Sequence, residues 1–85
     1  MTGEGPFRYR PDVLRALERH GVRPTSHTRP ELVREYVREL YKYEIRALRA
    51  RYLRNEFSKA TYSVLVEELR LSYPVLALLP RQFVE

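Results

Sequence analysis

The sequence predicts an all-α protein, a single small domain over residues 1–85, built around a long antiparallel helical hairpin. The chain is short and contains no cysteine, so one compact unit without disulfides is expected. No proline or glycine occurs between Pro30 and Pro74, and apolar residues recur there at helical spacing. These observations place the two hairpin helices at about 29–54 and 58–73.

A short helix is predicted before the hairpin, at about 11–20, after a loose leader at 1–10. Pro11 suits the first turn of a helix, and Asp12 suits the positive end of its dipole. Gly21 suits the left-handed residue that closes a helix. The apolar residues of this segment recur at helical spacing and are Val13, Leu14 and Leu17.

The first hairpin helix, 29–54, is predicted to begin at a capping box formed by Thr28 and Glu31. Its 26 residues would reach about 39 Å. Steps of 100° per residue give a broad apolar stripe made of Val33, Val37, Leu40, Tyr41, Ile45, Leu48 and Tyr52. A second stripe lies on a different side and holds Leu32, Tyr36, Tyr43, Ala47 and Ala50. Two stripes indicate two packing partners: the second hairpin helix for one, and helix 11–20, the tail or another subunit for the other.

The turn of the hairpin is predicted from Asn55 and Ser58. Asn55 tolerates the left-handed conformation that ends a helix, and Ser58 is a good N-cap. Phe57 and Tyr62 have the spacing of a hydrophobic staple. The second helix presents one apolar face and is ended by Pro74; that face holds Tyr62, Leu65, Val66, Leu69 and Tyr73.

The tail at 74–85 is unusually apolar and is interrupted by prolines. It is too short for another long helix. We expect it either to fold back over the hairpin or to present itself to a partner.

The hairpin turn resembles the SHOCT-type short helical hairpin, whose pattern is Gly-x-Ile-Thr/Ser-x-Glu-Glu-Phe/Tyr followed by leucines. Residues 55–62 match it in the spacing from the turn through Ser58 to Tyr62, with Leu69 beyond. Asn55 stands where that pattern has glycine, and Ala60 and Thr61 stand where it has glutamates. The resemblance covers about residues 45–71 and implies an oligomerisation or interaction module.

The chain has few histidines and aspartates and no cysteine, which are residue types that catalysis and metal binding often use. The only histidines, His20 and His27, have no second ligand at helical spacing, and Asp12 is the only aspartate. His20 is more simply a cation at the C-terminal end of a helix. We therefore expect no enzyme, cofactor or metal. With no long apolar run, we also expect no membrane span and a cytoplasmic location.

The chain has a formal net charge of +5, and its basic residues gather on helix 29–54. Six of them are candidate phosphate or nucleic-acid contacts: Arg38, Lys42, Arg46, Arg49, Arg51 and Arg54. Neighbouring glutamates favour an ion-paired, solvated face instead. Glu44 lies inside the main apolar stripe, where it either reaches solvent, pairs with an arginine such as Arg51, or makes a polar contact at an interface.

The function predicted from these features is non-catalytic protein–protein interaction, with self-association as a dimer or binding of another protein. A chain this short has little core of its own and has surplus apolar surface. Residues that we expect at the interface are Leu32, Tyr36, Tyr43, Leu76, Leu79 and Phe83. The alternative is an accessory protein that binds nucleic acid through its arginine-rich face.

Overall fold

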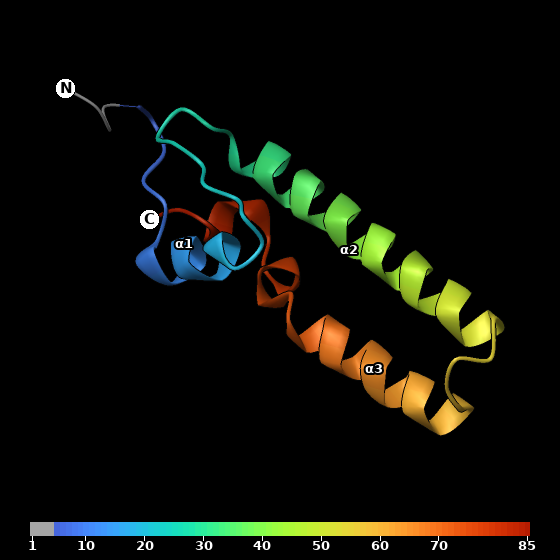
Figure 1. The fold of residues 1–85 in the computed structure, drawn as a ribbon. Helices are drawn as coiled ribbons and strands as arrows, with labels where there is room; N and C mark the ends of the chain where they lie inside the picture. The colour runs from blue at the N-terminus through green and yellow to red at the C-terminus, as the bar shows by residue number, and fades with distance from the viewer. Residues whose placement is uncertain (1–4) are drawn as a thin grey trace.

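The computed structural model describes residues 5–85 and confirms that the protein is all-α (Figure 1). Three α-helices are followed by two short 3₁₀ helices: α1 (Pro11–Glu18), α2 (Pro30–Leu53), α3 (Lys59–Leu71), η1 (Pro74–Ala77) and η2 (Pro80–Gln82). Residues 5–85 contain no β-strand, although Tyr9 and Val84 form an isolated antiparallel bridge.

Helix α1 starts at Pro11, as predicted, and ends at Glu18. Gly21 then adopts a positive φ of 74°, and the Val22 amide donates to the Leu17 carbonyl at 3.1 Å. This is the hydrogen bond of a Schellman closure, so the predicted role of Gly21 is confirmed.

The start of α2 corrects one prediction, because Thr28 and Glu31 form no capping box. The N-cap residue is Arg29, which has no side-chain cap, and Pro30 occupies the first turn. The Thr28 hydroxyl accepts a hydrogen bond from the Thr25 amide at 2.9 Å. The hydroxyl thus closes the preceding turn and is not used on the helix.

The turn between α2 and α3 follows the chemistry predicted for it. Asn55 has a φ of 63°, and the Glu56 amide donates to the Arg51 carbonyl at 3.1 Å, which closes α2. Ser58 Oγ accepts from the Thr61 amide at 3.1 Å and so caps α3. The rings of Phe57 and Tyr62 stack with centroids 6.3 Å apart, as expected of a hydrophobic staple.

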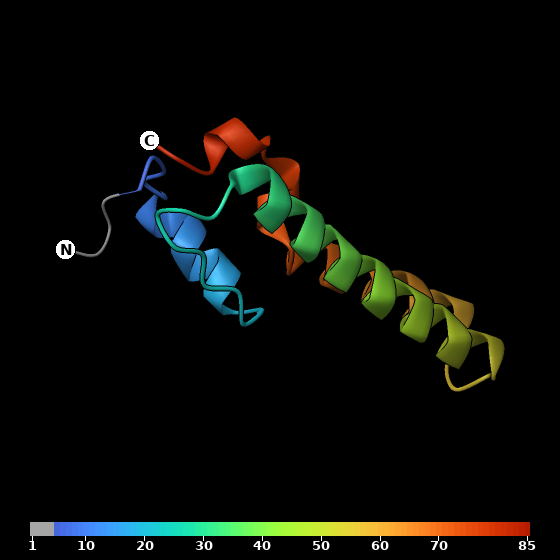
Figure 2. The ribbon, with the colours of Figure 1, turned by 90° about the horizontal axis from the view of Figure 1, so that it is seen from above.

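Helices α2 and α3 lie side by side and run in opposite directions, and α1 lies near the start of α2 (Figures 1 and 2). The molecule is elongated, with extents of 53 × 17 × 16 Å. The turn at 54–58 forms one end, and α1, η1 and η2 gather at the other.

The core lies at the end that holds α1. Its buried residues come from four separate segments of the chain and are Tyr9, Val13, Leu17, Val33, Val37, Tyr73, Val75 and Phe83. Residues after α3 therefore cover the first half of α2. Arg34 of α2 holds these C-terminal residues against α2, because its side chain donates hydrogen bonds to the Leu78 carbonyl at 2.8 Å and the Leu76 carbonyl at 2.7 Å.

The prediction of a loose leader at 1–10 is wrong for residues 5–10, and residues 1–4 lie outside the described part of the chain. The Phe7 amide donates to the Ser26 carbonyl and the Arg10 amide to the Phe83 carbonyl, both at 3.0 Å. Tyr9 is buried, and its hydroxyl donates to the Thr28 carbonyl. An aromatic side chain of this size supplies core volume that the short α1 cannot supply alone.

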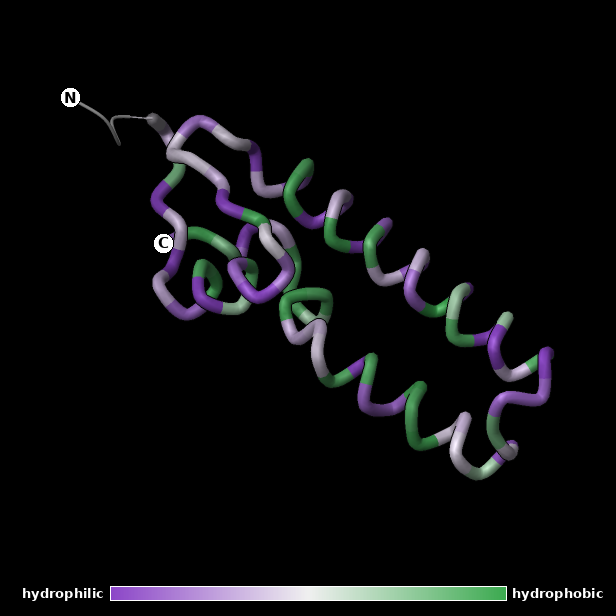
Figure 3. Tube along the Cα trace, viewed as in Figure 1, coloured by the Kyte–Doolittle hydropathy of each residue, from purple (hydrophilic) through white to green (hydrophobic). Residues whose placement is uncertain are grey.

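Beyond the core, the two long helices bury no residue between Arg38 and Ser72. Apolar positions nevertheless continue along both helices to the turn (Figure 3). We call this segment, residues 38–72, the distal hairpin.

Candidate interaction surface

The second apolar stripe of α2 is exposed. Leu32, Tyr36 and Tyr43 are 60%, 57% and 73% exposed, and Ala47 and Ala50 are also exposed. Neither α1 nor the C-terminal residues cover the stripe, so these side chains face solvent in the single chain.

The three interface candidates in the tail have different positions. Leu79 is 47% exposed, whereas Leu76 is partly buried against the core. Phe83 is fully buried at 0% exposure, and its assignment to the interface is therefore wrong. It is part of the buried core, where removing a large apolar ring from water stabilises the fold.

A groove of about 580 Å³ runs between α2 and α3 in the distal hairpin. Its lining residues come from both helices and are Tyr43, Glu44, Ala47, Leu48, Arg51, Leu65, Glu68 and Leu69. Tyr43 and Ala47 belong to both the groove and the exposed second stripe. We call the combined surface, which is the groove residues with Tyr36 and Ala50, the groove face.

Glu44 and Arg51 mark the two ends of the groove on α2. The Tyr73 hydroxyl donates a hydrogen bond to Glu44 Oε2, so Tyr73 is the partner of Glu44 within the chain. Arg51 donates from Nε to Glu56 at 2.9 Å, and its guanidinium lies 5.3 Å from the centre of the Phe57 ring. The hydrogen bonds that Arg51 and Arg54 donate to Glu56 lower the pKa of that carboxyl group. The groove is therefore acidic toward the core and basic toward the turn.

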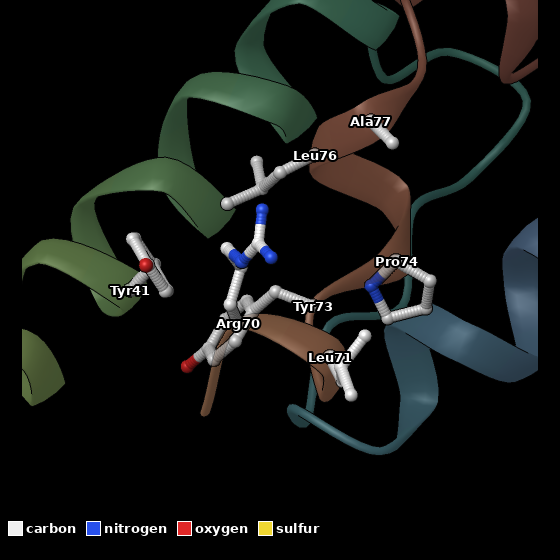
Figure 4. A pocket seen from close by; sticks show the side chains of 7 residues that line it. All are labelled: Tyr41, Arg70, Leu71, Tyr73, Pro74, Leu76 and Ala77. Atoms are coloured by element: carbon white, nitrogen blue, oxygen red, sulfur yellow. The ribbon is translucent and has the colours of Figure 1, made fainter. Parts of the chain in front are cut away.

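A second pocket of about 460 Å³ lies where η1 meets α2 and α3 (Figure 4). It is lined by Tyr41, Arg70, Leu71, Tyr73, Pro74, Leu76 and Ala77. Arg70 is paired with both carboxylate oxygens of Glu67 at 2.9 Å, which raises its pKa. The pocket is thus mainly apolar, and its one charge already has a counterion.

Tyr73 joins the core to the distal hairpin. The His20 ring stacks on it with centroids 4.0 Å apart, and His20 Nε2 lies 2.8 Å from the Ser72 carbonyl oxygen. Burial, followed by the hydrogen bond to Glu44, raises the pKa of Tyr73. His20 thus contributes packing and a long-range hydrogen bond that its position after α1 did not reveal.

The six basic candidates, five on α2 and Arg54 just after it, are mostly paired with glutamates. Arg38 lies 3.7 Å from Glu35 and Lys42 lies 3.3 Å from Glu39, which lowers the pKa of Glu39. Arg51 and Arg54 both pair with Glu56 at 2.9 Å. Within the described chain only Arg46 and Arg49 of the six have no ion pair.

Residues 5–85 show no grouping of three or more histidine, cysteine or acidic residues that could hold a metal ion. In the same residues every buried side-chain nitrogen or oxygen has a hydrogen-bond partner. None of the described helices combines the length and the apolar character that crossing a membrane requires.

Comparison of the chain with protein families, with curated proteins and with solved structures found no match. The sequence identified Tyr36 and Tyr43 on the groove face, and it placed Leu65 and Leu69 on the apolar face of the second hairpin helix, but it did not assign Leu65, Glu68 and Leu69 to the same surface. The spacing of these three residues is helical, but only the packing of α3 on α2 shows that they adjoin the second stripe.

Proposed function

We propose that this protein is a small non-catalytic interaction protein that self-associates as a dimer through its groove face. One observation carries the proposal: the distal hairpin has apolar residues along both helices and buries none of them.

Two helices alone cover each other only along a single line of contact. The apolar residues beside that line, such as Leu48, Leu65 and Leu69, stay partly exposed at the groove. A second helical hairpin packed on the same face would make a four-helix arrangement and exclude water from these side chains. Small domains without disulfides often gain stability in this way.

A second copy of the chain is the partner that the groove face fits best. A twofold interface uses the same patch on both subunits, so one apolar face with both charge signs can complement itself. Its exposed aromatic residues, Tyr36 and Tyr43, belong to the residue types enriched at interfaces. The resemblance of residues 45–71 to an oligomerisation hairpin agrees with this proposal.

Nucleic-acid binding is the less favoured alternative. Four of the six basic candidates on α2 have glutamate partners within the chain. Binding phosphate would require these ion pairs to be broken or shared, and the remaining pair, Arg46 and Arg49, is a small charged surface.

Sedimentation equilibrium over a range that reaches high micromolar concentration tests the proposal. We expect a dimer for the natural chain, and a rise in the dissociation constant of at least about tenfold for Tyr43→Glu, which places charge on the apolar face. Arg38→Glu on the opposite side of α2 is the control and should change it little. A strictly monomeric chain that still melts cooperatively would contradict the proposal.

A further inference from the structure

We infer that the two subunits pack antiparallel, with α2 lying over α2 and each Glu44 facing Arg51 of the partner subunit. The twofold axis then crosses the groove face at the level of Ala47 and Leu48. This inference rests on the proposed self-association and specifies the arrangement of the partner.

The charge pattern of the groove supplies the reason. Glu44 and Arg51 are seven residues apart on α2, about 10 Å along the helix, and Ala47 and Leu48 lie between them. The acidic end of the groove also contains Glu68 from α3. Counted from the stacked Tyr52–Tyr62 pair, Glu44 is eight residues away and Glu68 six, so their levels differ by only about 3 Å.

Two face-to-face arrangements are compatible with a twofold axis. If the axis runs along the helices, α2 lies over α3 of the partner, and Glu44 meets Glu68 of the partner subunit at the same level. If the axis runs across the helices, α2 lies over α2 in the opposite direction, and Glu44 meets Arg51 of the partner subunit. Opposed like charges disfavour the first arrangement, and complementary charges favour the second.

The groups involved have hydrogen-bonding capacity for these contacts. Within residues 5–85, Glu44 uses Oε2 toward Tyr73, and Arg51 uses Nε toward Glu56. Glu44 Oε1 and the two terminal nitrogens of Arg51 therefore remain for the other subunit. A guanidinium can serve two carboxylates because its five N–H donors point in a planar fork.

The length of the distal hairpin also allows this antiparallel arrangement. With the axis midway between Ala47 and Leu48, residues of α2 whose numbers add up to 95 lie at the same level, as Glu44 and Arg51 of the partner subunit do. Asn55 in the turn reaches only the level of the partner's Leu40. The buried core begins at Val37, so each turn ends before the other subunit's core. The small Ala47 side chain at the axis lets the two helices approach closely.

Cysteine crosslinking tests the arrangement directly, because the chain has no cysteine of its own. Ala47→Cys should form a disulfide-linked dimer on mild oxidation, since the two copies of residue 47 meet at the axis. Lys59→Cys at the start of α3 is the matched control and should stay unlinked, since antiparallel packing separates the two turns. Linkage through position 59 and not through position 47 would overturn the inference.

Two charge-neutralising variants give an independent measurement. Glu44→Gln should raise the dissociation constant of the dimer roughly three- to tenfold, because each subunit loses an ion pair with the other. Glu68→Gln removes the same charge from the same groove and should not weaken the dimer. If both variants tighten the dimer, the carboxylates face each other and the antiparallel arrangement is wrong.

The failure of this inference differs from that of the proposed function. A natural chain that is monomeric at high micromolar concentration overturns both. A natural chain that forms a dimer with the reverse crosslinking pattern overturns only the antiparallel arrangement.

Discussion

At the scale of single residues, two tyrosine hydroxyls connect segments that are far apart in the sequence. Tyr9 donates to the Thr28 carbonyl, and Tyr73 donates to Glu44. Burial raises the pKa of Tyr9 to about 12, and the nearby Glu31 carboxylate adds to the effect. Burial and the Glu44 hydrogen bond raise the pKa of Tyr73 as well. Both phenols must stay protonated for the native contacts to persist.

The folded protein should therefore lose stability in alkali. The pKa of Tyr9 is raised from 10.0 to about 12 and the pKa of Tyr73 is also raised above 10.0, so their contribution to stability is complete below pH 10 and is lost progressively as the pH rises above it. Urea unfolding at a series of pH values measures this dependence. Tyr73→Phe should reduce its slope, and Tyr36→Phe, at an exposed position, should leave it unchanged. An equal slope in all three proteins would contradict this explanation.

The sequence could not identify the partners of these residues. Glu44 was recognised as unusual because its position on the helix is apolar, but the hydroxyl that binds it is 29 residues away. His20 and the Ser72 carbonyl are 52 residues apart. Helical periodicity reports on neighbours three or four residues away, and it contains no information about contacts of this range.

At the scale of elements, the helix ends determined by local chemistry were predictable. Asn55 and Gly21 have the positive φ values expected of them, and Ser58 caps α3. Thr28 was the exception, because a second hydroxyl residue, Thr25, competes for it. A capping motif in the sequence cannot show which of two adjacent turns will use the side chain.

The cap at Ser58 should control the stability of the distal hairpin more than that of the core. Ser58→Ala removes the acceptor for the Thr61 amide and should cost about 1 kcal/mol. Hydrogen exchange of α3 amides should accelerate, while the amides of Val33 and Val37 keep their protection, because the distal hairpin contains no buried residue. Ser63→Ala within α3 is the control and should be neutral or slightly stabilising. Equal acceleration in the core would show that the hairpin and the core unfold together.

At the scale of the whole molecule, the core is displaced to one end and is completed by residues after α3. The sequence showed that residues 74–85 are apolar but left open whether they cover this chain or another. The structure divides them: Val75 and Phe83 are buried, while Leu79 remains exposed. Composition alone cannot make that distinction, because it depends on how the prolines at 74 and 80 turn the backbone against α2.

Phe83 should accordingly be one of the most important residues for folding. Phe83→Ala would leave a cavity in the core and should cost about 3–5 kcal/mol, a large part of the stability of a domain this small. Thermal unfolding followed by circular dichroism should show a much lower midpoint or no folded baseline. Leu79→Ala, a similar truncation at an exposed position, should change the free energy of unfolding by less than about 1 kcal/mol. Similar midpoints for the two variants would contradict the observed position of Phe83.

The bridge between Tyr9 and Val84 has a practical consequence for labelling. It holds residues near both ends of the described chain together, at the end of the molecule opposite the turn (Figure 1). Fluorophores or fused reporters joined after Glu85 would project away from the distal hairpin. In the proposed antiparallel dimer two such reporters would occupy opposite poles of the particle, so energy transfer between them would be weak. In that proposed dimer a pair of labels on the hairpin turns would lie much nearer, about 20 Å apart along the helices, and labels near the middle of α2 would be the closest together.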